Sequence, residues 1–121
     1  MELLVITNQL LAACDEAITR FYDMRERQAE PDFFSDVKPF ADEKRVLLER
    51  WQQLAYEWIT VNHPKHMHRQ QIDYARDAME QFFVQSFYKA TSKKRFIQSI
   101  ESTKYTLGTL KRYVEEGEAH V

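Results

Sequence analysis

Between Phe96 and Val114, an apolar or small side chain returns after four or three residues, in regular alternation. The positions are Phe96, Ile100, Thr103, Leu107, Leu110 and Val114. Because an α-helix has about 3.6 residues per turn, this spacing places all of these side chains on one face of a helix. The stretch is therefore predicted to be an amphipathic helix, whose apolar face needs other apolar faces to pack against.

Three earlier stretches repeat the pattern and supply such faces. The first, predicted to end near Arg27, has the seven-residue repeat Leu4, Leu11 and Ile18, with Cys14 and Phe21 between and Leu3, Leu10 and Ala17 beside it. The second, predicted to begin close to Pro39, has Leu47, Trp51, Leu54 and Trp58, flanked by Leu48 and Ala55. The third has Ile72, Ala75, Met79, Phe82 and Phe83. The spacing thus predicts four helices.

Short connections determine how these helices are arranged. Residues 62–66 are predicted to join the second helix to the third, and Thr91 and Ser92 to join the third to the fourth, with Ser92 as an N-cap. Short connections make consecutive helices antiparallel, which predicts an all-α, up-down-up-down four-helix bundle. We expect one domain over residues 1–121, whose core contains Trp51, Leu54, Trp58, Phe82, Phe83, Ile100, Leu107 and Leu110. Two glycines and three prolines are too few for the turns of a β-sandwich.

The connection between the first and second helices, EPDFFSDVKPF at residues 30–40, is too apolar for a solvated loop. Pro31 and Pro39 fix its edges, and Asp32 is placed to cap a short helical turn between them. We expect its apolar side chains to form a lid over one end of the bundle, because aromatic rings are more often buried than exposed. The alternative is an exposed patch for a partner. The side chains concerned are Phe33, Phe34, Val37 and Phe40.

The residues also favour a cytoplasmic location. The single cysteine, Cys14, cannot form an internal disulfide, so nothing indicates an oxidising compartment. Glu2 stands where a signal peptide carries positive charge, and polar residues interrupt the apolar run MELLVITNQLLAACDEA before it reaches membrane-spanning length. We therefore expect no membrane association.

Five motifs occur in order over nearly the whole chain: DFFSDVKPF, ERW, HPKHMHRQQID, QSFY and KKRFIQSIESTKYTL. In combination they are specific, and the chain resembles the YppE-like family of small bacterial proteins from low-GC Gram-positive bacteria. The resemblance implies a compact helical bundle and a cytoplasmic protein. It implies no catalytic residues.

The residues themselves do not indicate an enzyme or a cofactor site. A di-iron bundle needs Glu-x-x-His pairs on facing helices. Three positions before the four histidines stand Thr60, His63, Lys65 and Gly117 instead. Cys14 lies on the apolar stripe of the first helix, which favours packing over nucleophilic catalysis. Because Gly108 and Gly117 are the only glycines, a Gly-rich phosphate loop is also excluded. We expect neither catalysis nor a bound cofactor.

His63, His66 and His68 cluster around Pro64 in the connection between the second and third helices. An antiparallel bundle brings the C-terminal tail to the same end, where nitrogen and oxygen ligands together would suit zinc or nickel. The tail residues concerned are Glu115, Glu116, Glu118 and His120. The alternative is a structural connection, in which Pro64 ends one helix and a histidine caps the next. We expect this alternative, with exposed histidines and no specific metal.

The strongest functional indication is a group of cations, Lys89, Lys93, Lys94 and Arg95, which we call the basic corner. Aromatic residues are interleaved with the cations of this region, as in many nucleic-acid-binding proteins. Residues 93–95 occupy the predicted first turn of the fourth helix, where the helix dipole disfavours positive charge, so a compensating group is expected. Acids around the first connection are predicted to lie at the same end and to compensate these cations: Asp23, Glu26, Glu30, Asp32 and Asp36.

The charge balance bears on what the basic corner binds. Residues 1–61 contain 7 Lys/Arg and 12 Asp/Glu, whereas residues 62–121 contain 10 and 7, and the overall net charge is −2. A corner neutralised by nearby acids suits a protein partner better than a phosphate backbone. We therefore predict a protein-interaction or adaptor module whose basic corner contacts an unidentified protein partner. The alternative is a nucleic-acid-associated protein that uses the same corner.

Overall fold

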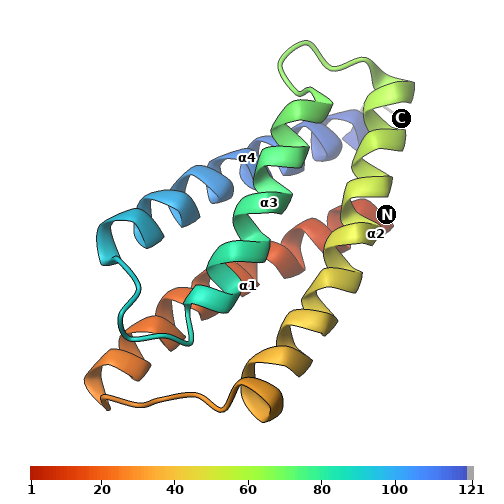
Figure 1. The fold of residues 1–121 in the computed structure, drawn as a ribbon. Helices are drawn as coiled ribbons and strands as arrows, with labels where there is room; N and C mark the ends of the chain where they lie inside the picture. Colours follow the sequence, from red (N-terminus) through yellow and green to blue (C-terminus); the bar gives the residue numbers. More distant parts are fainter. Residues whose placement is uncertain (120–121) are drawn as a thin grey trace.

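The computed structural model describes the backbone of residues 1–119 and the side chains of residues 1–117. Over these residues the regular elements are all helical: α1 (Glu2–Glu26), η1 (Phe33–Val37), α2 (Lys38–Asn62), α3 (Arg69–Gln85) and α4 (Lys93–Ala119). η1 is a single π-helical turn that leads directly into α2. The four α-helices run alternately up and down, as Figure 1 shows. The predicted all-α four-helix bundle is confirmed.

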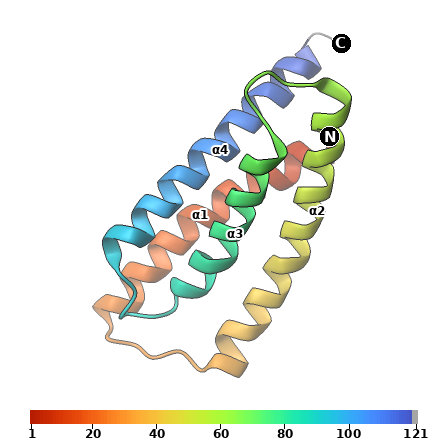
Figure 2. The same ribbon diagram turned by 45° about the horizontal axis from the view of Figure 1, so that its top comes forward.

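The helices do not contact one another equally. α4 packs along α1 and α3, and α2 packs along α3, whereas α1 and α2 share a smaller contact. Figures 1 and 2 both show α1 and α2 diverging toward the end of the bundle that carries η1. The chain begins at the opposite end, where α2 also ends. The seam between α1 and α2 is therefore the most open one in the bundle.

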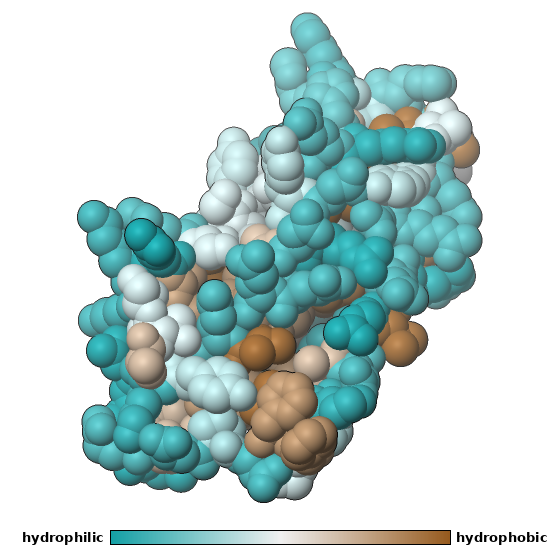
Figure 3. Space-filling view, in the orientation of Figure 1, coloured by the Kyte–Doolittle hydropathy of each residue, from teal (hydrophilic) through white to brown (hydrophobic). Residues whose placement is uncertain are grey.

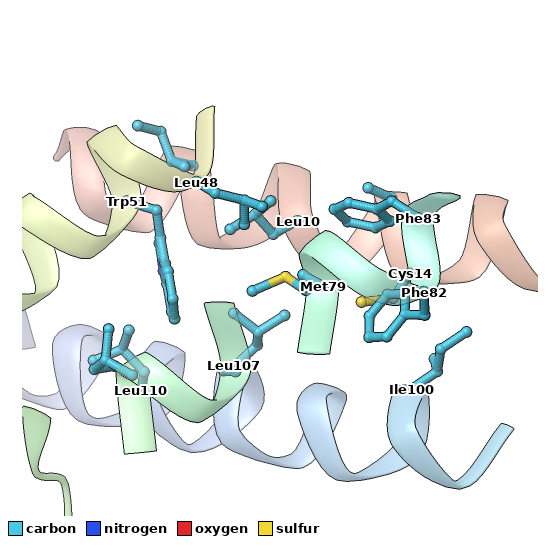
Figure 4. Packing of buried hydrophobic residues seen from close by; sticks show 14 of the residues in the cluster. Leu10, Cys14, Leu48, Trp51, Met79, Phe82, Phe83, Ile100, Leu107 and Leu110 are labelled. Atoms are coloured by element: carbon cyan, nitrogen blue, oxygen red, sulfur yellow. The ribbon is translucent and has the colours of Figure 1, made fainter. Parts of the chain in front are cut away.

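Side chains from all four helices fill one core (Figure 4). In α3 and α4 the buried stripes are those predicted from the sequence, since each predicted position from 72 to 83 and from 96 to 114 is at most 4% exposed. In Figure 4, Trp51 of α2 points across the core toward Leu110 of α4. Both residues are fully buried in the same cluster.

The core also contains a buried polar pair. The indole Nε1 of Trp51 donates a hydrogen bond to Oγ1 of Thr7 at 3.1 Å. Thr7 Oγ1 in turn donates to the carbonyl oxygen of Leu3 at 2.7 Å. Both side chains are buried, so these hydrogen bonds replace the water that their polar atoms lose on folding.

In α1 and α2 the centre of the buried stripe differs from the prediction. The buried centre is Leu3, Leu10 and Ala17 in α1 and Leu48, Trp51 and Ala55 in α2. The partly buried edge is Leu4, Leu11 and Ile18 in α1 and Leu47, Leu54 and Trp58 in α2. The side chains of neighbouring residues point in directions about 100° apart around a helix. The buried set and the partly buried set both recur every seven residues, so the spacing alone does not identify the set that faces the core. Of the predicted core residues, Leu54 and Trp58 therefore lie at its edge.

The first connection contains a short helical turn, η1, that is capped by Asp32 as predicted. Asp32 Oδ1 accepts the N–H of Ser35 at 3.0 Å, which caps the turn. Asp36 Oδ2 accepts the N–H of Asp32 at 2.8 Å. These two hydrogen bonds fix the backbone of η1 relative to the residue that precedes it.

The predicted lid is wrong for two of its four residues. Val37 is fully buried, and Phe40 packs edge-on against Phe83 and Phe87, with ring centroids 6.3 and 5.3 Å apart. Phe33 and Phe34, however, are 49% and 77% exposed. Because Val37 and Phe40 occupy the inward side of the connection, the other two rings reach no core surface.

The two remaining connections are both longer than predicted, the one between α3 and α4 by five residues. They cover residues 63–68 and 86–92. α3 ends early because tight turns follow it, with the N–H of Phe87 donating to Val84 and that of Tyr88 to Gln85, both at 3.1 Å. Ser92 directly precedes α4, and its carbonyl oxygen accepts the N–H of Phe96 at 3.0 Å. Over residues 1–119 we find no helical segment with the length and apolar character needed to cross a bilayer.

Candidate functional site

The basic corner lies where the α3–α4 connection meets α4. Lys89 belongs to the connection, and Lys93, Lys94 and Arg95 form the first turn of α4. Lys93 Nζ lies 5.3 Å from the ring centroid of Tyr22 on α1, a cation–π contact. Lys94 and Arg95 are exposed. The structure therefore brings the four predicted residues to one end of the bundle.

The nearby acids compensate these cations only in part. Lys89 Nζ lies 3.3 Å from Glu30 Oε1, as the predicted pairing requires. Asp23 instead pairs with Arg27 at 2.8 Å, and the hydrogen bond from Arg27 lowers the pKa of Asp23. Over the part of the chain that the structure describes, no ion pair is formed by Lys93, Lys94 or Arg95. The expected neutralisation therefore holds for Lys89 alone.

Arg20, which sequence reasoning did not single out, organises the same end. Its guanidinium on α1 lies against the rings of both Phe40 and Phe87, 4.4 and 4.6 Å from their centroids. Arg20 Nε donates to Ser86 Oγ at 2.8 Å, and burial lowers the pKa of Arg20. Within the described residues, Arg20 Nη2 is buried without a hydrogen-bond partner. Arg20 thus joins α1, the start of α2 and the α3–α4 connection.

Two exposed rings on η1, Phe33 and Phe34, form what we call the aromatic pair. They contact each other edge to face, with ring centroids 5.3 Å apart. Figure 3 shows apolar surface gathered at the lower end of this face, where η1 and the start of α2 lie. The exposed patch considered as an alternative for this connection therefore applies to these two residues.

The three histidines of the second connection are exposed and serve largely as helix ends. His63 follows α2 in the left-handed conformation, with φ 47°, and its N–H donates to a carbonyl in the last turn. His68 precedes α3, and its N–H donates to Gln71 Oε1 at 2.7 Å. His66 is followed by Met67, which is fully buried and anchors the connection to the core. The stretch is therefore a largely exposed connection between two helices, as predicted.

The predicted alternative, a metal site with the tail, finds no support among the described side chains. No group of three His, Cys, Asp or Glu residues within this part of the chain is placed to hold a metal ion. Glu115 and Glu116 lie 4.0 and 3.9 Å from Lys111 and Arg112 on their own helix. The side chains of Glu118 and His120 lie outside the described residues.

Cys14 is fully buried among apolar side chains, as its place on the α1 stripe predicts. Burial, with the charge of Asp15 as a smaller cause, raises the pKa of its thiol to about 12. The thiol is therefore protonated at neutral pH and unsuited to nucleophilic attack. It acts as a packing residue.

A polar cluster that the sequence did not reveal joins α2 to α3. Asp73 Oδ1 accepts hydrogen bonds from Tyr56 and from Gln52 Nε2, the latter at 2.8 Å. The hydrogen bond to Asp73 raises the pKa of Tyr56. Arg76 donates to Gln52 and pairs with Glu80 at 3.2 Å. The members of this cluster satisfy one another, so we assign it to helix pairing and not to binding.

The comparisons with known proteins add an uncharacterised relative. Residues 7–114 match the family described as a bacterial domain of unknown function, DUF1798. The chain is 33% identical over 109 residues to the uncharacterised protein YppE of Bacillus subtilis (strain 168), which covers 90% of this chain and 89% of that protein. No activity or partner is named for either.

Solved structures share the fold. The crystal structure of YppE from Bacillus subtilis has a TM-score of 0.93 at 30% identity, over 98% of this chain and 96% of that one. That of a Listeria innocua protein of unknown function has a TM-score of 0.92 at 30% identity, over 98% and 95%. The resemblance indicated by the five sequence motifs is confirmed, and the chain belongs to the DUF1798 family of bacterial domains of unknown function.

Proposed function

We propose that this protein is a protein-interaction module that binds another protein through the end of the bundle carrying η1 and the basic corner. The aromatic pair is the observation that carries the proposal. Phe34 is 77% exposed on a turn whose backbone is fixed by the Asp32 cap. Exposed rings that are already held in place lose little conformational freedom when a partner covers them, so they are well suited to anchor an interface.

The charges at this end favour a protein ligand. Glu30, Asp32 and Asp36 lie beside or within η1, whereas residues 93–95 at the start of α4 are cations. A surface with both signs of charge orients a partner with the complementary pattern. A nucleic-acid backbone, which is negative throughout, would be attracted to the basic corner and repelled by the acids of the connection.

A nucleic-acid ligand is the second candidate, and one observation favours it. Over the described side chains, the three cations of the first turn of α4 make no ion pair. Tyr22, the ring against Lys93, is itself exposed. Cations beside an accessible ring are the elements with which proteins hold single-stranded nucleic acid.

Partner capture tests the leading proposal. Tagged wild-type protein, Phe34→Ser and Tyr105→Ser are used to capture proteins from cells of the source organism after nuclease treatment. Tyr105, on α4, is a matched control because it is 78% exposed, against 77% for Phe34. The proposal expects a protein that is retained by wild type and Tyr105→Ser and lost with Phe34→Ser. Equal retention by all three would contradict it.

Fluorescence anisotropy with single- and double-stranded oligonucleotides tests the second candidate. The leading proposal expects affinity no better than about 10⁻⁴–10⁻⁶ M at physiological salt. Nanomolar binding that weakens steeply with salt and is lost in a Lys93→Glu, Lys94→Glu variant would establish the nucleic-acid role instead. A Lys65→Glu, Arg112→Glu variant makes the same change of charge outside the basic corner and serves as control.

A further inference from the structure

Two hollows follow one another along the open seam between α1 and α2. The first, of about 550 Å³, is lined by Ala12 of α1 and Leu47 of α2. The second, of about 290 Å³, is lined by Leu3 of α1 and Trp58 of α2. Arg50, which lines the first hollow, pairs with Glu2, which lines the second, at 2.6 Å. We call the two hollows together the α1–α2 groove.

An apolar stripe on α2 runs along this groove. Its members, Leu47, Leu54, Trp58 and Val61, lie along four helical turns, or about 21 Å. The first three are only partly buried and Val61 is exposed. The stripes of α3 and α4, by contrast, are covered completely by the bundle. α2 therefore carries more ordered apolar surface than the bundle itself buries, which is typical of a helix that accepts another element.

The charges of the groove indicate what that element carries. Of the two cationic side chains in its lining, Arg50 binds both carboxylate oxygens of Glu2 at 2.6 and 2.8 Å, whereas Lys44 keeps its charge and lies with Nζ over the Phe40 ring at 5.2 Å. Within the described part of the chain, the remaining lining carboxylates form no ion pair: Glu16, Glu43 and Glu57. The lining side chains thus carry four carboxylates against two cations, with Glu43 and Glu57 toward the two ends of the groove, and this excess of negative charge complements a basic ligand.

The same charges disfavour a second copy of this chain in the groove. If two α2 helices packed antiparallel about Arg50, Glu43 of one copy would face Glu57 of the other, because both lie seven residues from Arg50. A parallel arrangement would set each carboxylate against its own equivalent. Both arrangements place like charges together at the ends of the stripe.

We propose that the α1–α2 groove binds an amphipathic helix of another protein, with an apolar stripe about four turns long flanked by lysine or arginine. The stripe of the ligand would cover Leu54 and Trp58, and its flanking cations would meet Glu43 and Glu57. The proposal concerns a different surface from the aromatic pair and does not rest on the function proposed above.

Peptide binding followed by NMR tests this proposal on the full chain. The probes are a panel of 18-residue synthetic peptides with leucine at helical spacing and lysine beside the stripe. A matched panel carries glutamate in place of lysine, and a third has the lysine peptides in scrambled order. We expect lysine peptides to shift the amide signals of residues lining the groove and to bind at least about tenfold more tightly than both other panels.

Charge-reversed variants separate this site from general attraction to an acidic protein. Glu43→Lys with Glu57→Lys should weaken binding of the lysine peptides at least about tenfold. Asp77→Lys with Glu101→Lys makes the same change of charge at exposed positions on α3 and α4, and should leave the affinity unchanged apart from a small non-specific loss.

Four results would overturn the proposal. One is absence of binding by the whole lysine panel at millimolar peptide. The second is equal weakening by both double variants, and the third is equal binding of lysine and glutamate peptides. The fourth is a dimer in sedimentation equilibrium whose formation shifts the groove signals, since the occupant would then be a second copy. All four substitutions are at exposed positions, and circular dichroism would confirm that the variants remain folded.

Discussion

Replacing Thr7 by valine should destabilise the bundle by about 1–3 kcal/mol, although valine has nearly the same shape. Thr7 Oγ1 accepts the indole N–H of Trp51 at 3.1 Å, and both side chains are buried. Valine has no acceptor, so the indole N–H would remain buried without a partner. The magnitude is the cost of leaving one neutral donor desolvated and unpaired.

A double-mutant cycle isolates that hydrogen bond. Trp51→Phe removes the donor and leaves Thr7 Oγ1 still donating to the Leu3 carbonyl at 2.7 Å, so its cost comes from lost ring contacts. When Thr7→Val is added to Trp51→Phe, no donor is left unpaired. The double variant should therefore lose about 1 kcal/mol less than the sum of the single losses.

Urea unfolding followed by far-UV circular dichroism measures these differences, because the helical signal does not depend on the tryptophan being replaced. Thr7→Ser, which keeps the hydroxyl and removes a methyl group, should lose only about 0.8 kcal/mol. Two results would refute the reasoning. They are a loss below about 0.5 kcal/mol for Thr7→Val, or single losses that add within about 0.3 kcal/mol in the double variant.

Three other residues give independent checks. Leu107→Ala should lose about 2–5 kcal/mol in the same titration because Leu107 is fully buried, and a loss under about 0.5 kcal/mol would place it outside the core. Cys14, whose thiol pKa is raised to about 12 by burial, should resist a thiol reagent at pH 8 until urea unfolds the protein; rapid labelling of the native state would contradict its burial. The hydrogen bond from the Ser35 N–H lowers the pKa of Asp32, so its carboxyl should titrate below the ordinary value by NMR. The stabilisation linked to this bond is present above the ordinary aspartate pKa and is lost as the pH falls through the lowered value; an ordinary midpoint would mean that the cap does not form.

In α3 and α4 the sequence was sufficient where an apolar position is bordered by polar residues on both sides, as Ile100 is by Ser99 and Glu101. In α1, two leucines stand side by side at positions 3–4 and again at 10–11. Either member of each pair continues a seven-residue repeat, so periodicity could not identify the one facing the core. Tertiary contacts made that choice, because α1 packs along α4 over one side and faces the open seam on the other.

Similar reasoning separates the predictable parts of the candidate site from the rest. The cations at 93–95 are consecutive, so any helix that begins there gathers them, and the sequence located them correctly. The hydrogen bond from Arg20 to Ser86 joins residues that are 66 positions apart in the chain, and no local sequence pattern predicts it. Phe33 and Phe34 are as apolar as Phe40, and only the packing of the connection determines that they remain exposed.

The position of Arg20 has a consequence for local unfolding. Arg20 contacts Phe40 at the start of α2, where the α1–α2 connection ends, and Phe87 in the α3–α4 connection. Opening either of these two connections therefore separates a ring from the same guanidinium. Opening one connection would leave that charge with fewer contacts and thereby weaken the other. We therefore expect the two connections to open as one cooperative unit in native-state hydrogen exchange, with a shared opening free energy. A protein bound to the aromatic pair should slow amide exchange throughout the α3–α4 connection, beyond Lys89, the one residue that this connection contributes to the basic corner.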